Sequence, residues 1–242
     1  MDKYNKNDPA SIQSMFTSIA NNYDRTNAIL SLQLHKYWNR SLIRSVVTPA
    51  SPKDFLDLCS GTGEIAFTYL KQAHTPCQTY LLDFSEGMLA CAKDKASRLH
   101  FPVTHQLHYI QADAQKIPLP DSSIDCATIA YGIRNVKEPG LCLQEVLRVL
   151  RPGGTFGILE LTQPSNPLWR FSHRLYLNTM VPLLGRCFTS NQAAYQYLCN
   201  SIQSFIQPAD LKGLLLNKGF HEVKSISLIG GIATILVAKK SL

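Results

Sequence analysis

The residues best suited to bind a ligand follow a short apolar segment, residues 54–58, which predicts a strand. Gly61, Thr62 and Gly63 come shortly after it, and a helical pattern begins near residue 63. Glycine adopts positive φ at little cost and lets backbone amides approach a ligand closely. The first N–H groups of the following helix lack partners within that helix. This order of strand, turn and helix predicts a nucleotide-binding turn.

Two carboxylates beside the turn indicate the kind of nucleotide. Asp57 ends the strand and Glu64 follows the second glycine, whereas a dinucleotide site places a pyrophosphate at this helix N-terminus. Carboxylates there suit a ligand with positive charge and no phosphate, such as S-adenosylmethionine, which carries an ammonium and a sulfonium group. The glycine pattern alone also fits NAD enzymes. An NAD-linked oxidoreductase and a non-catalytic cofactor-binding protein therefore stay open as alternatives.

Acids also end the next two predicted strands. Asp83 follows the apolar run 79–82, a position from which an acid binds both ribose hydroxyls. Asp113 follows the run 106–110 and is placed to accept a hydrogen bond from an adenine amino group. Because parallel strands end at the same edge of a sheet, we expect these acids to form one site. The predicted cofactor residues are Asp57, Gly61, Thr62, Gly63, Asp83, Asp113, Ala114 and Ala130.

Strand and helix patterns alternate along the chain and would position these residues. Strands are predicted near 54–58, 79–82, 106–110, 124–130 and 155–160, and helices near 63–72, 86–98 and 140–150. This alternation is typical of an α/β fold with a doubly wound, mostly parallel sheet. The helix at 140–150 is expected to end at Arg151-Pro152-Gly153-Gly154. Segments 226–229 and 234–238 predict a closing antiparallel hairpin.

Length and composition allow one domain of this kind. The chain has 242 residues, of which 45% are hydrophobic, enough to fill the core of one α/β domain. We divide it into an N-terminal helical cap (1–50), a cofactor-binding core (51–162), a lid and substrate segment (163–207) and a closing helix and hairpin (208–242). Asp8 followed by proline predicts where the first helix of the cap begins.

The charge and the cysteine and histidine content bear on the partners, the cellular compartment and the metal binding of the protein. The formal charge of +7 suggests an anionic neighbour, but no basic run with interleaved aromatic residues indicates nucleic acid. Seven cysteines without a Cys-x-x-Cys pair favour a reducing cytoplasm. The chain shows no signal-peptide pattern and no apolar run of eighteen residues. His100, His105 and His108 lack an acidic or cysteine partner, so we expect no metal site.

Three longer motifs carry a resemblance to a known family. They are Met15-Phe16-x-x-Ile19-Ala20-x-x-Tyr23-Asp24-x-x-Asn27-x-x-x-Ser31 with His35 and Trp38, then Gly132-Ile133-Arg134-Asn135-Val136, and then Tyr195-x-Tyr197-Leu198-x-x-Ser201-Ile202-x-x-Phe205. Together they resemble the ubiquinone and menaquinone biosynthesis C-methyltransferases, the UbiE/MenG family, from about Met15 to the C-terminus. The resemblance implies a class I methyltransferase fold with a seven-stranded sheet and helices on both faces. It also implies S-adenosylmethionine as methyl donor and carbon methylation of a polyprenylated quinol.

The acceptor ring is expected to be demethylmenaquinol. The benzoquinol intermediate of ubiquinone biosynthesis is the alternative, and an RNA methyltransferase is a more distant one. The sequence departs from the family at Gln33, where glycine is usual, at Ile206, where proline is usual, and at Leu236, where histidine is common. Asn200 replaces the usual glutamate beside Ser201, and this departure bears on substrate choice.

Arg134 and Asn135 are the candidates for activating the acceptor. They follow strand 124–130, at the edge where doubly wound sheets place their reaction crevice. An aromatic carbon becomes nucleophilic when its ortho hydroxyl ionises, so a phenol pKa near 10 must fall by about 3, equivalent to roughly 4 kcal/mol. We expect Arg134 to stabilise the phenolate, by way of a water that takes the proton, and Asn135 to orient the ring oxygen. A purely structural salt bridge is the alternative for Arg134.

Asp24 is a further candidate base, with helix capping as its alternative role. The residues expected to contact the quinol are Tyr23, His35, Tyr197 and Ser201. His35 is also considered as a base, and a place in the core is the alternative for both His35 and Tyr23.

The segment 167–186 predicts a lid, because it mixes apolar and basic residues. The apolar residues expected to line a slot are Leu168, Phe171, Leu175 and Met180, and the basic residues expected to face anionic headgroups are Arg170, Arg174 and Arg186. This pattern is typical of interfacial helices, although a plain helix over the sheet is the alternative. A prenyl tail requires access to lipid, so we expect a cytoplasmic protein in transient contact with an anionic membrane surface. The sequence also leaves a homodimer open.

Overall fold

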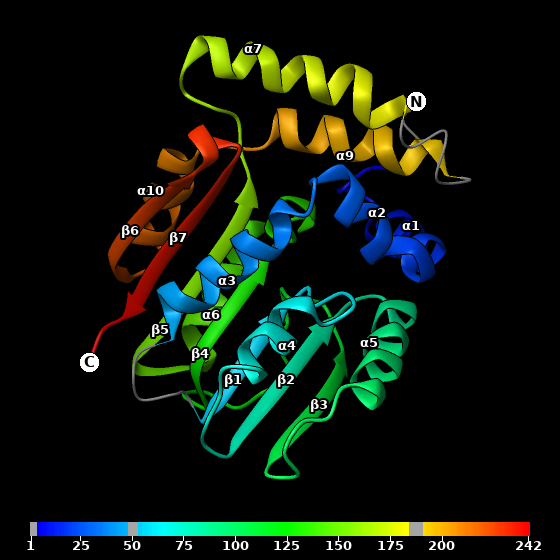
Figure 1. Ribbon diagram of the computed structural model, residues 1–242. Coiled ribbons are helices and arrows are strands. Elements are labelled where there is room, and N and C mark those ends of the chain that lie inside the picture. The colour runs from blue at the N-terminus through cyan, green and yellow to red at the C-terminus, as the bar shows by residue number, and fades with distance from the viewer. Residues whose placement is uncertain (1–3, 48–52, 184–190) are drawn as a thin grey trace.

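The computed structural model describes residues 4–47, 53–183 and 191–242. Its centre is a seven-stranded sheet in the order β3-β2-β1-β4-β5-β7-β6, with helices on both faces (Figure 1). The strands are β1 (Asp54–Leu58), β2 (Cys77–Asp83), β3 (His105–Gln111), β4 (Ile124–Ala130), β5 (Leu150–Leu161), β6 (Phe220–Leu228) and β7 (Ala233–Lys240). Strands β1 to β5 are parallel, and β7 is antiparallel to both neighbours. The predicted α/β class and mostly parallel seven-stranded sheet are confirmed.

The helices follow the predicted alternation. They are α1 (Pro9–Ile19), η1 (Ala20–Asn22), α2 (Tyr23–Leu30), α3 (Leu34–Val46), α4 (Glu64–Leu70), α5 (Glu86–Arg98), η2 (Ile133–Asn135), α6 (Pro139–Val149), α7 (Pro167–Leu175), η3 (Tyr176–Met180, a π-helical turn), α9 (Gln192–Ser204), α10 (Pro208–Asn217) and η4 (Ile229–Gly231). The first helix begins as the sequence indicates. Asp8 caps it by accepting a hydrogen bond from the N–H of Ser11, and Pro9 occupies its first turn.

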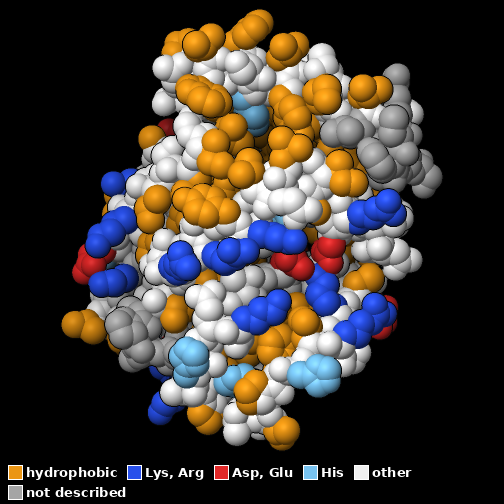
Figure 2. All heavy atoms as spheres, in the orientation of Figure 1, with side chains coloured by type: hydrophobic (Ala, Val, Ile, Leu, Met, Phe, Trp, Pro, Cys, Tyr) orange, Lys and Arg blue, Asp and Glu red, His pale blue; other side chains and the backbone are white. Residues whose placement is uncertain are grey.

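Four helices form an upper layer over the carboxyl ends of the parallel strands (Figure 1). They are α1 and α2, which precede the sheet in the chain, and α7 and α9, which lie between β5 and the last two strands. A small apolar cluster joins α9 to the end of the α7 segment, and its buried members are Leu177, Val181, Tyr195, Cys199 and Ile202. Figure 2 shows hydrophobic side chains gathered on this upper layer, whereas most of the lysine and arginine side chains on the same face lie below it.

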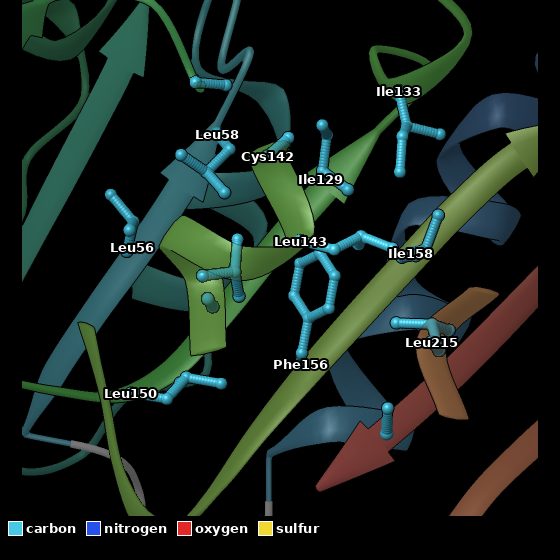
Figure 3. Close-up of a cluster of buried hydrophobic side chains, with 14 of the residues drawn as sticks. Leu56, Leu58, Ile129, Ile133, Cys142, Leu143, Leu150, Phe156, Ile158 and Leu215 are labelled. Atoms are coloured by element: carbon cyan, nitrogen blue, oxygen red, sulfur yellow. The ribbon is translucent and has the colours of Figure 1, made fainter. Parts of the chain in front are cut away.

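Each face of the sheet has its own apolar core. On one face, α6 contributes Leu143 and α10 contributes Leu215, which pack with Phe156 of β5 (Figure 3). On the other face, the helices α3, α4 and α5 pack against β1, β2 and β5, with Leu42 and Phe55 completely buried. The two cores fix the strands, and therefore fix the loops at their carboxyl ends.

Helix α3 lies unusually close to β5. A Cβ atom at Gly157 would come within 2.4 Å of Val46 Cγ1 and 2.9 Å of Leu42 Cδ1, so only glycine permits this approach. The close packing brings the N-terminal half of α3, with Trp38 and Asn39, to the edge of the sheet where the parallel strands end.

The structure corrects one predicted boundary. Arg151-Pro152-Gly153-Gly154 was expected to form a turn before a strand near 155–160, yet these residues already belong to β5. Ile124 of β4 pairs with Leu150 and Cys126 pairs with Thr155, so the register shifts once between these pairs. The proline and glycines lie within this shift. A bulge of this kind bends a strand without ending it. The closing hairpin is confirmed and is longer than predicted, although Ile229 lies in η4 rather than in β6.

Candidate active site

The glycine turn after β1 is held in a left-handed backbone conformation. Gly61 and Gly63 have φ of 53° and 82°, and Cys59 has φ of 50°. At Gly63 a Cβ atom would lie 2.6 Å from the ring of Phe67, so this glycine is required both by its backbone conformation and by space. The backbone N–H of Ser60 donates to Leu82 O on β2 at 3.0 Å. The turn is therefore tied to the neighbouring strand.

The three acids predicted at successive strand ends occupy the same edge of the sheet. Asp83 accepts hydrogen bonds from the backbone N–H groups of Gly61 and Ser85, both at 2.8 Å. Burial raises the pKa of the Asp83 carboxyl, and these backbone donors oppose the rise. Asp113 accepts from the backbone N–H and the side-chain amide of Gln115.

Asp57 is more deeply buried than the other two acids, with 1% of its surface exposed. It accepts hydrogen bonds from the hydroxyl of Thr128 at 2.9 Å and from the N–H of Ala66 at 3.2 Å. Loss of water raises the pKa of Asp57 to about 7, more than these two donors can offset. A cation brought near this carboxyl would favour its ionised form.

Glu64 and Asp24 already share a cation from the chain itself. Lys95 Nζ on α5 forms a salt bridge with each of them, at 2.7 Å from Glu64 Oε1, and lies 3.2 Å from the hydroxyl of Thr62. Thr62 also donates a short hydrogen bond to Asp24. The sequence predicts that Glu64 suits a cationic ligand, and in the structure this carboxylate is already paired with the lysine. The cluster fastens α2 and α4 to α5 beneath the turn.

Two adjoining cavities open at this edge. The smaller, of about 100 Å³, is lined by Asp83, Asp113 and Ala114 together with Phe84 and Met88. These walls combine two carboxylates with apolar surface, as a nucleoside requires. Five of the predicted cofactor residues thus share one cavity, namely Asp83, Asp113 and Ala114 together with Gly61 and Ala130.

The larger cavity, of about 380 Å³, lies between the glycine turn and the upper layer. Its walls come from α2, α3, η2, α7, η3 and α9, and most of its lining side chains are apolar. Residues that line both cavities are Phe16, Tyr23, Cys59, Gly61, Ala130, Tyr131 and Asn135. A ligand in one cavity would therefore meet a ligand in the other beside the glycine turn.

Most of the predicted site residues lie on these walls. Those on the larger cavity are Tyr23, Asp24, His35, Asp57, Gly61, Thr62, Ala130, Arg134, Asn135 and Tyr197, and those on the smaller are Tyr23, Gly61, Asp83, Asp113, Ala114, Ala130 and Asn135. Gly63 and Ser201 line neither cavity. Gly63 shapes the turn from behind, and Ser201 lies in contact with Arg134.

Arg134 forms a buried salt bridge with Glu160, the residue before the last one of β5. The side chains are exposed by only 6% and 2%, so water hardly screens the pair. The same guanidinium donates to Tyr131 O at 2.6 Å and, through Nε, to Ser201 Oγ at 3.4 Å. Burial raises the pKa of the Glu160 carboxyl, and the arginine opposes the rise.

Asn135 is held by a tyrosine from the upper layer. The hydroxyl of Tyr197 donates to Asn135 Oδ1 at 3.0 Å, and Asn135 Nδ2 lies 3.4 Å from Tyr131 O. Tyr131 has φ of 55°, a strained conformation of the kind that collects at functional sites. The conformation turns its carbonyl toward both Arg134 and Asn135. The residues after β4 and those of α9 therefore meet at one point.

Tyr23 and His35 line the larger cavity from the N-terminal cap. Burial raises the pKa of the Tyr23 hydroxyl, and burial lowers the pKa of His35, so both favour their neutral forms. His35 Nδ1 lies 2.7 Å from the hydroxyl of Ser31. That hydrogen bond fixes the orientation of the imidazole ring.

The lid faces the opposite way from the prediction. Leu168, Phe171, Leu175 and Met180 do not line the larger cavity, and between 44% and 73% of each side chain is exposed. The cavity is lined instead by the other side of this segment: Trp169, Ser172, His173, Tyr176, Leu177 and Val181. Arg186, predicted to face headgroups, lies outside the described residues. No helix among the described residues is long and apolar enough to cross a bilayer.

Sequence reasoning missed Lys95, Glu160 and His173. Glu160 left a signal, because an acid follows the apolar run Ile158-Leu159 at the end of a strand, where buried charge needs a partner. Lys95 left none, since it is one of several lysines on a predicted amphipathic helix. Among the residues that the structure describes, no group of three His, Cys, Asp or Glu side chains could hold a metal ion.

Comparison with known proteins decides the family. The model of the ubiE/COQ5 methyltransferase family matches residues 3–240. The chain belongs to this family. It is 51% identical over 240 residues to a demethylmenaquinone methyltransferase of Protochlamydia amoebophila, covering 99% of both chains. It is 42% identical to a demethylmenaquinone methyltransferase of Chlamydia pneumoniae, covering 94% of this chain and 95% of that one.

Solved structures show the same fold at low identity. A methyltransferase from Thermotoga maritima that depends on S-adenosylmethionine superposes with a TM-score of 0.64 at 16% identity, covering 94% of this chain and 99% of that one. A phosphoethanolamine N-methyltransferase of Haemonchus contortus, solved with S-adenosylhomocysteine, has a TM-score of 0.62 at 13% identity and covers 90% of this chain and 59% of that one. The family member described here is an S-adenosylmethionine-dependent methyltransferase.

The residues present fit that methyl donor. Asp83 and Asp113 in the smaller cavity offer acceptors for ribose hydroxyls and an adenine amino group. The buried hydroxyl of Ser60, beside Gly61 in the turn, has no hydrogen-bond partner among the described residues. A Cβ atom at Gly61 would meet only Tyr23, at 3.9 Å. The space above the turn is therefore open for the amino-acid portion of the donor.

Proposed function

We propose that this enzyme methylates a ring carbon of demethylmenaquinol, a polyprenylated naphthoquinol, with S-adenosylmethionine as methyl donor. The larger, mostly apolar cavity carries the proposal, because it adjoins the cofactor turn and shares Gly61, Ala130 and Tyr131 with the smaller cavity. An apolar space beside the donor suits an aromatic ring with a hydrocarbon tail. The names of the bacterial relatives favour the naphthoquinol ring.

The protein's task is to make a ring carbon nucleophilic. The donor supplies an electrophilic methyl group on sulfur, and the ring carbon that takes it later loses its own proton. The chain must lower the pKa of the neighbouring hydroxyl and hold the carbon about 3 to 3.5 Å from the methyl group. Asn135 of η2 lines both cavities and Arg134 lines the larger one, so these two residues are suited to both tasks.

In this proposal Arg134 supplies positive charge without acting as a free cation. Its pairing with Glu160 and its hydrogen bond to Tyr131 O fix the guanidinium in place. The hydrogen bonds of this guanidinium with other described residues use Nε and Nη1, and none uses Nη2. That group is suited to donate to the phenolate oxygen or to a water that removes the proton.

Asn135 orients the ring oxygen, and the remaining residues support it. Tyr197 donates to Asn135 Oδ1 and Asn135 Nδ2 donates to Tyr131 O, so the second N–H of the amide is the one assigned to the ligand. Ser201 acts through its contact with Arg134. Tyr23 and His35 contribute the wall around the ring.

Asp24, a candidate base, is assigned a positioning part in this proposal. Lys95 and Thr62 engage its two carboxylate oxygens, so removing a proton from the quinol would require the cluster to open. With these bonds intact, Asp24 holds the N-terminal cap over the glycine turn.

The experiment is transfer of labelled methyl from S-adenosylmethionine to detergent-solubilised, reduced demethylmenaquinone. A demethylated benzoquinol precursor and total RNA are offered in parallel. Label in the naphthoquinol alone supports the proposal, and label in both quinols marks an enzyme that serves both pathways. Label confined to the benzoquinol or to RNA refutes the assigned acceptor.

We also propose that the exposed side of α7 touches an anionic membrane surface. The exposed apolar residues on this side are Leu168, Phe171 and Leu175, and Met180 and Leu183 follow them along the chain. Arg170 and Arg174 lie on the same helix, where Arg170 Nε donates to Pro164 O at 2.8 Å. Apolar side chains flanked by arginine are typical of interfacial helices. Contact there would bring a lipid-dissolved tail to the mouth of the cavity.

Co-sedimentation with vesicles tests this surface. The protein should pellet with vesicles containing anionic lipid at low salt, and Phe171→Ser should weaken pelleting while leaving the cofactor-induced thermal shift unchanged. A matched control is Leu216→Ser, which changes an exposed leucine on α10. If the wild-type protein stays in the supernatant and instead forms a dimer that Phe171→Ser disrupts, the face is an interface between two copies and the membrane proposal fails.

A further inference from the structure

Three buried polar atoms have no hydrogen-bond partner among the side chains that the structure describes. They are Trp38 Nε1, Ser60 Oγ and His173 Nδ1, and their residues are only 3%, 8% and 7% exposed. All three residues line the larger cavity. Folded proteins pair nearly all buried polar groups. Unpaired polar atoms on the walls of one cavity therefore indicate a ligand that forms hydrogen bonds with them.

His173 differs from the other two in its position. Ser60 belongs to the glycine turn, where the donor binds, and Trp38 comes from α3, which precedes that turn in the chain. His173 comes from α7, where its neighbours on the wall include Trp169 and Leu177. Its unpaired nitrogen therefore belongs to the acceptor part of the cavity.

The segment around His173 is held firmly. The hydroxyl of Tyr176 donates to Leu30 O on α2 at 2.7 Å, and Cys199 Sγ donates to Leu177 O at 3.0 Å. The ring of Trp169 lies against the turn between β6 and β7, where a Cβ atom at Gly230 would come within 3.5 Å of it. The segment that carries the imidazole is thus fixed in advance, which lowers the entropy cost of a specific contact.

The chemistry of this imidazole suits an uncharged hydroxyl group. Burial lowers the pKa of His173, and no charged side chain contributes to the change, so the ring is neutral at pH 7. A neutral imidazole has one N–H donor and one nitrogen acceptor. A hydroxyl can pair with Nδ1 whether that nitrogen is the donor or the acceptor, whereas a carboxylate or phosphate can pair with it only in the tautomer that has the proton on Nδ1.

A reduced quinone has two hydroxyl groups, on opposite sides of the ring. One adjoins the carbon that accepts the methyl group, and the proposed function assigns it to Arg134 and Asn135. The other adjoins the carbon that bears the prenyl tail, and it has no assigned partner. The tail must leave the cavity toward the upper layer, which is where α7 supplies its wall.

We propose that His173 Nδ1 hydrogen bonds this second hydroxyl of the quinol and makes the lid helix a determinant of substrate specificity. The inference rests on the proposed function, because it assumes a quinol acceptor. It assigns His173 a role that the three sequence motifs do not contain. The enzyme should therefore prefer a ring with two hydroxyls to an otherwise identical ring with one.

A pair of substrates and a pair of histidine variants test the proposal. The substrates are the prenylated demethylated naphthoquinol and a prenylated 1-naphthol that keeps only the oxygen beside the methylated carbon. We expect His173→Phe to raise the KM for the quinol about tenfold, the effect of leaving one hydrogen bond unmade in a buried site, and to leave the KM for the naphthol unchanged. His173→Asn, which keeps a polar group on a short side chain, should recover part of the loss.

The control is His221→Phe, which makes the same exchange at an exposed position in β6 and should leave both KM values unchanged. Thermal shift with S-adenosylhomocysteine verifies that each variant folds and binds cofactor. An equal loss on both substrates, or no loss on either, would overturn the role of His173. If the wild-type enzyme methylates neither substrate, the proposed function fails as well, which separates the two failures.

Discussion

The two halves of the crevice differ in how their polar side chains are satisfied. At the ends of β1, β2 and β3, the acids Asp57, Asp83 and Asp113 each accept at least two hydrogen bonds from the protein. On the wall formed by α7, His173 keeps an unpaired buried nitrogen in mostly apolar surroundings. The acids of the cofactor half are therefore fixed by the protein before any ligand arrives, although Ser60 Oγ of the glycine turn is also unpaired among the described residues. The wall formed by α7 has no such set of acids and leaves the nitrogen of His173 for the acceptor to pair with.

This difference matches the chemistry that each half must perform. A charged donor of fixed shape needs several fixed polar contacts. A prenylated ring offers little beyond two oxygens and a large apolar surface, so few polar contacts must determine its orientation. The residues of η2 lie between the halves, and changes there should show whether cofactor binding and acceptor activation are separable.

The largest effect is expected from Arg134→Ala. The change leaves the buried carboxylate of Glu160 without its cation, which should cost about 3 to 5 kcal/mol of unfolding free energy. Turnover should fall at least about 100-fold, because the phenolate loses a fixed donor. Affinity for S-adenosylhomocysteine should stay near the wild-type value, as measured by calorimetry on protein that remains folded.

A double variant separates the two losses. Arg134→Gln with Glu160→Gln removes both charges while keeping hydrogen-bonding groups of similar size, so it should regain most of the stability and none of the turnover. Wild-type turnover in either variant would show that the arginine is only structural, and the proposed role would be abandoned.

Asp57→Asn should change how stability depends on pH. Native Asp57 keeps its proton up to about pH 7, whereas the unfolded chain loses it near pH 3.8. Between these values the native state binds more protons, so this group makes wild-type stability fall as pH rises through the window, by up to about 4 kcal/mol. An asparagine can accept from Ala66 N and donate to Thr128 Oγ1, and it has no proton to lose.

Urea unfolding at pH 5 and pH 8 provides the comparison. The variant should gain stability relative to wild type as the pH is raised. The affinity of wild type for S-adenosylmethionine should increase between pH 6 and 8, and that of the variant should not. If the stabilities of the two proteins change in parallel with pH, the Asp57 carboxyl ionises near its ordinary pKa, and burial does not raise that pKa.

Gly132→Ala tests the contact between the turn and η2. A Cβ atom there would lie 2.5 Å from Cys59 Cβ, although φ of −110° suits alanine. We expect a loss of about 1 to 3 kcal/mol from overpacking and weaker binding of S-adenosylhomocysteine, seen by thermal unfolding and calorimetry. Cys59→Gly in the same chain removes the opposing atom at a residue with positive φ, so it should restore both. A double variant no better than Gly132→Ala would contradict this explanation.

The cofactor half could be predicted largely from the sequence. The alternation of strands and helices placed Asp57, Asp83 and Asp113 at strand ends, and parallel strands necessarily bring those ends to one edge. The salt bridge of Arg134 with Glu160 was harder to predict. It joins residues after β4 and at the end of β5, and its partner becomes evident only when these strands are known to be neighbours.

The orientation of the lid could not be read from periodicity. Leu168, Phe171 and Leu175 form one apolar stripe at helical spacing, and Trp169, Leu177 and Val181 belong to a second. Tertiary packing chose the second stripe, because Leu177 and Val181 meet the apolar side of α9. His173, one turn before Leu177 on this second stripe, therefore lies in the cavity wall without any local signal.

The smallest expected effect concerns the entry to α3, which supplies part of the acceptor wall. Gln33 has φ of 65° and ψ of 0°, a left-handed conformation that costs an L-residue about 1 to 2 kcal/mol. The resemblance to the UbiE/MenG family leads us to expect glycine at this position. Gln33→Gly should therefore stabilise the protein by about 0.5 kcal/mol, since relief of strain exceeds the extra entropy that glycine gives the unfolded chain.

Lys36→Gly is the matched control, because this residue lies in the first turn of the same helix. Glycine there relieves no strain and should cost about 1 kcal/mol. Urea unfolding of the two variants beside wild type measures both changes. If glycine destabilises the protein equally at both positions, the left-handed entry to α3 carries no strain, and the departure of this chain from its family at Gln33 is without energetic consequence.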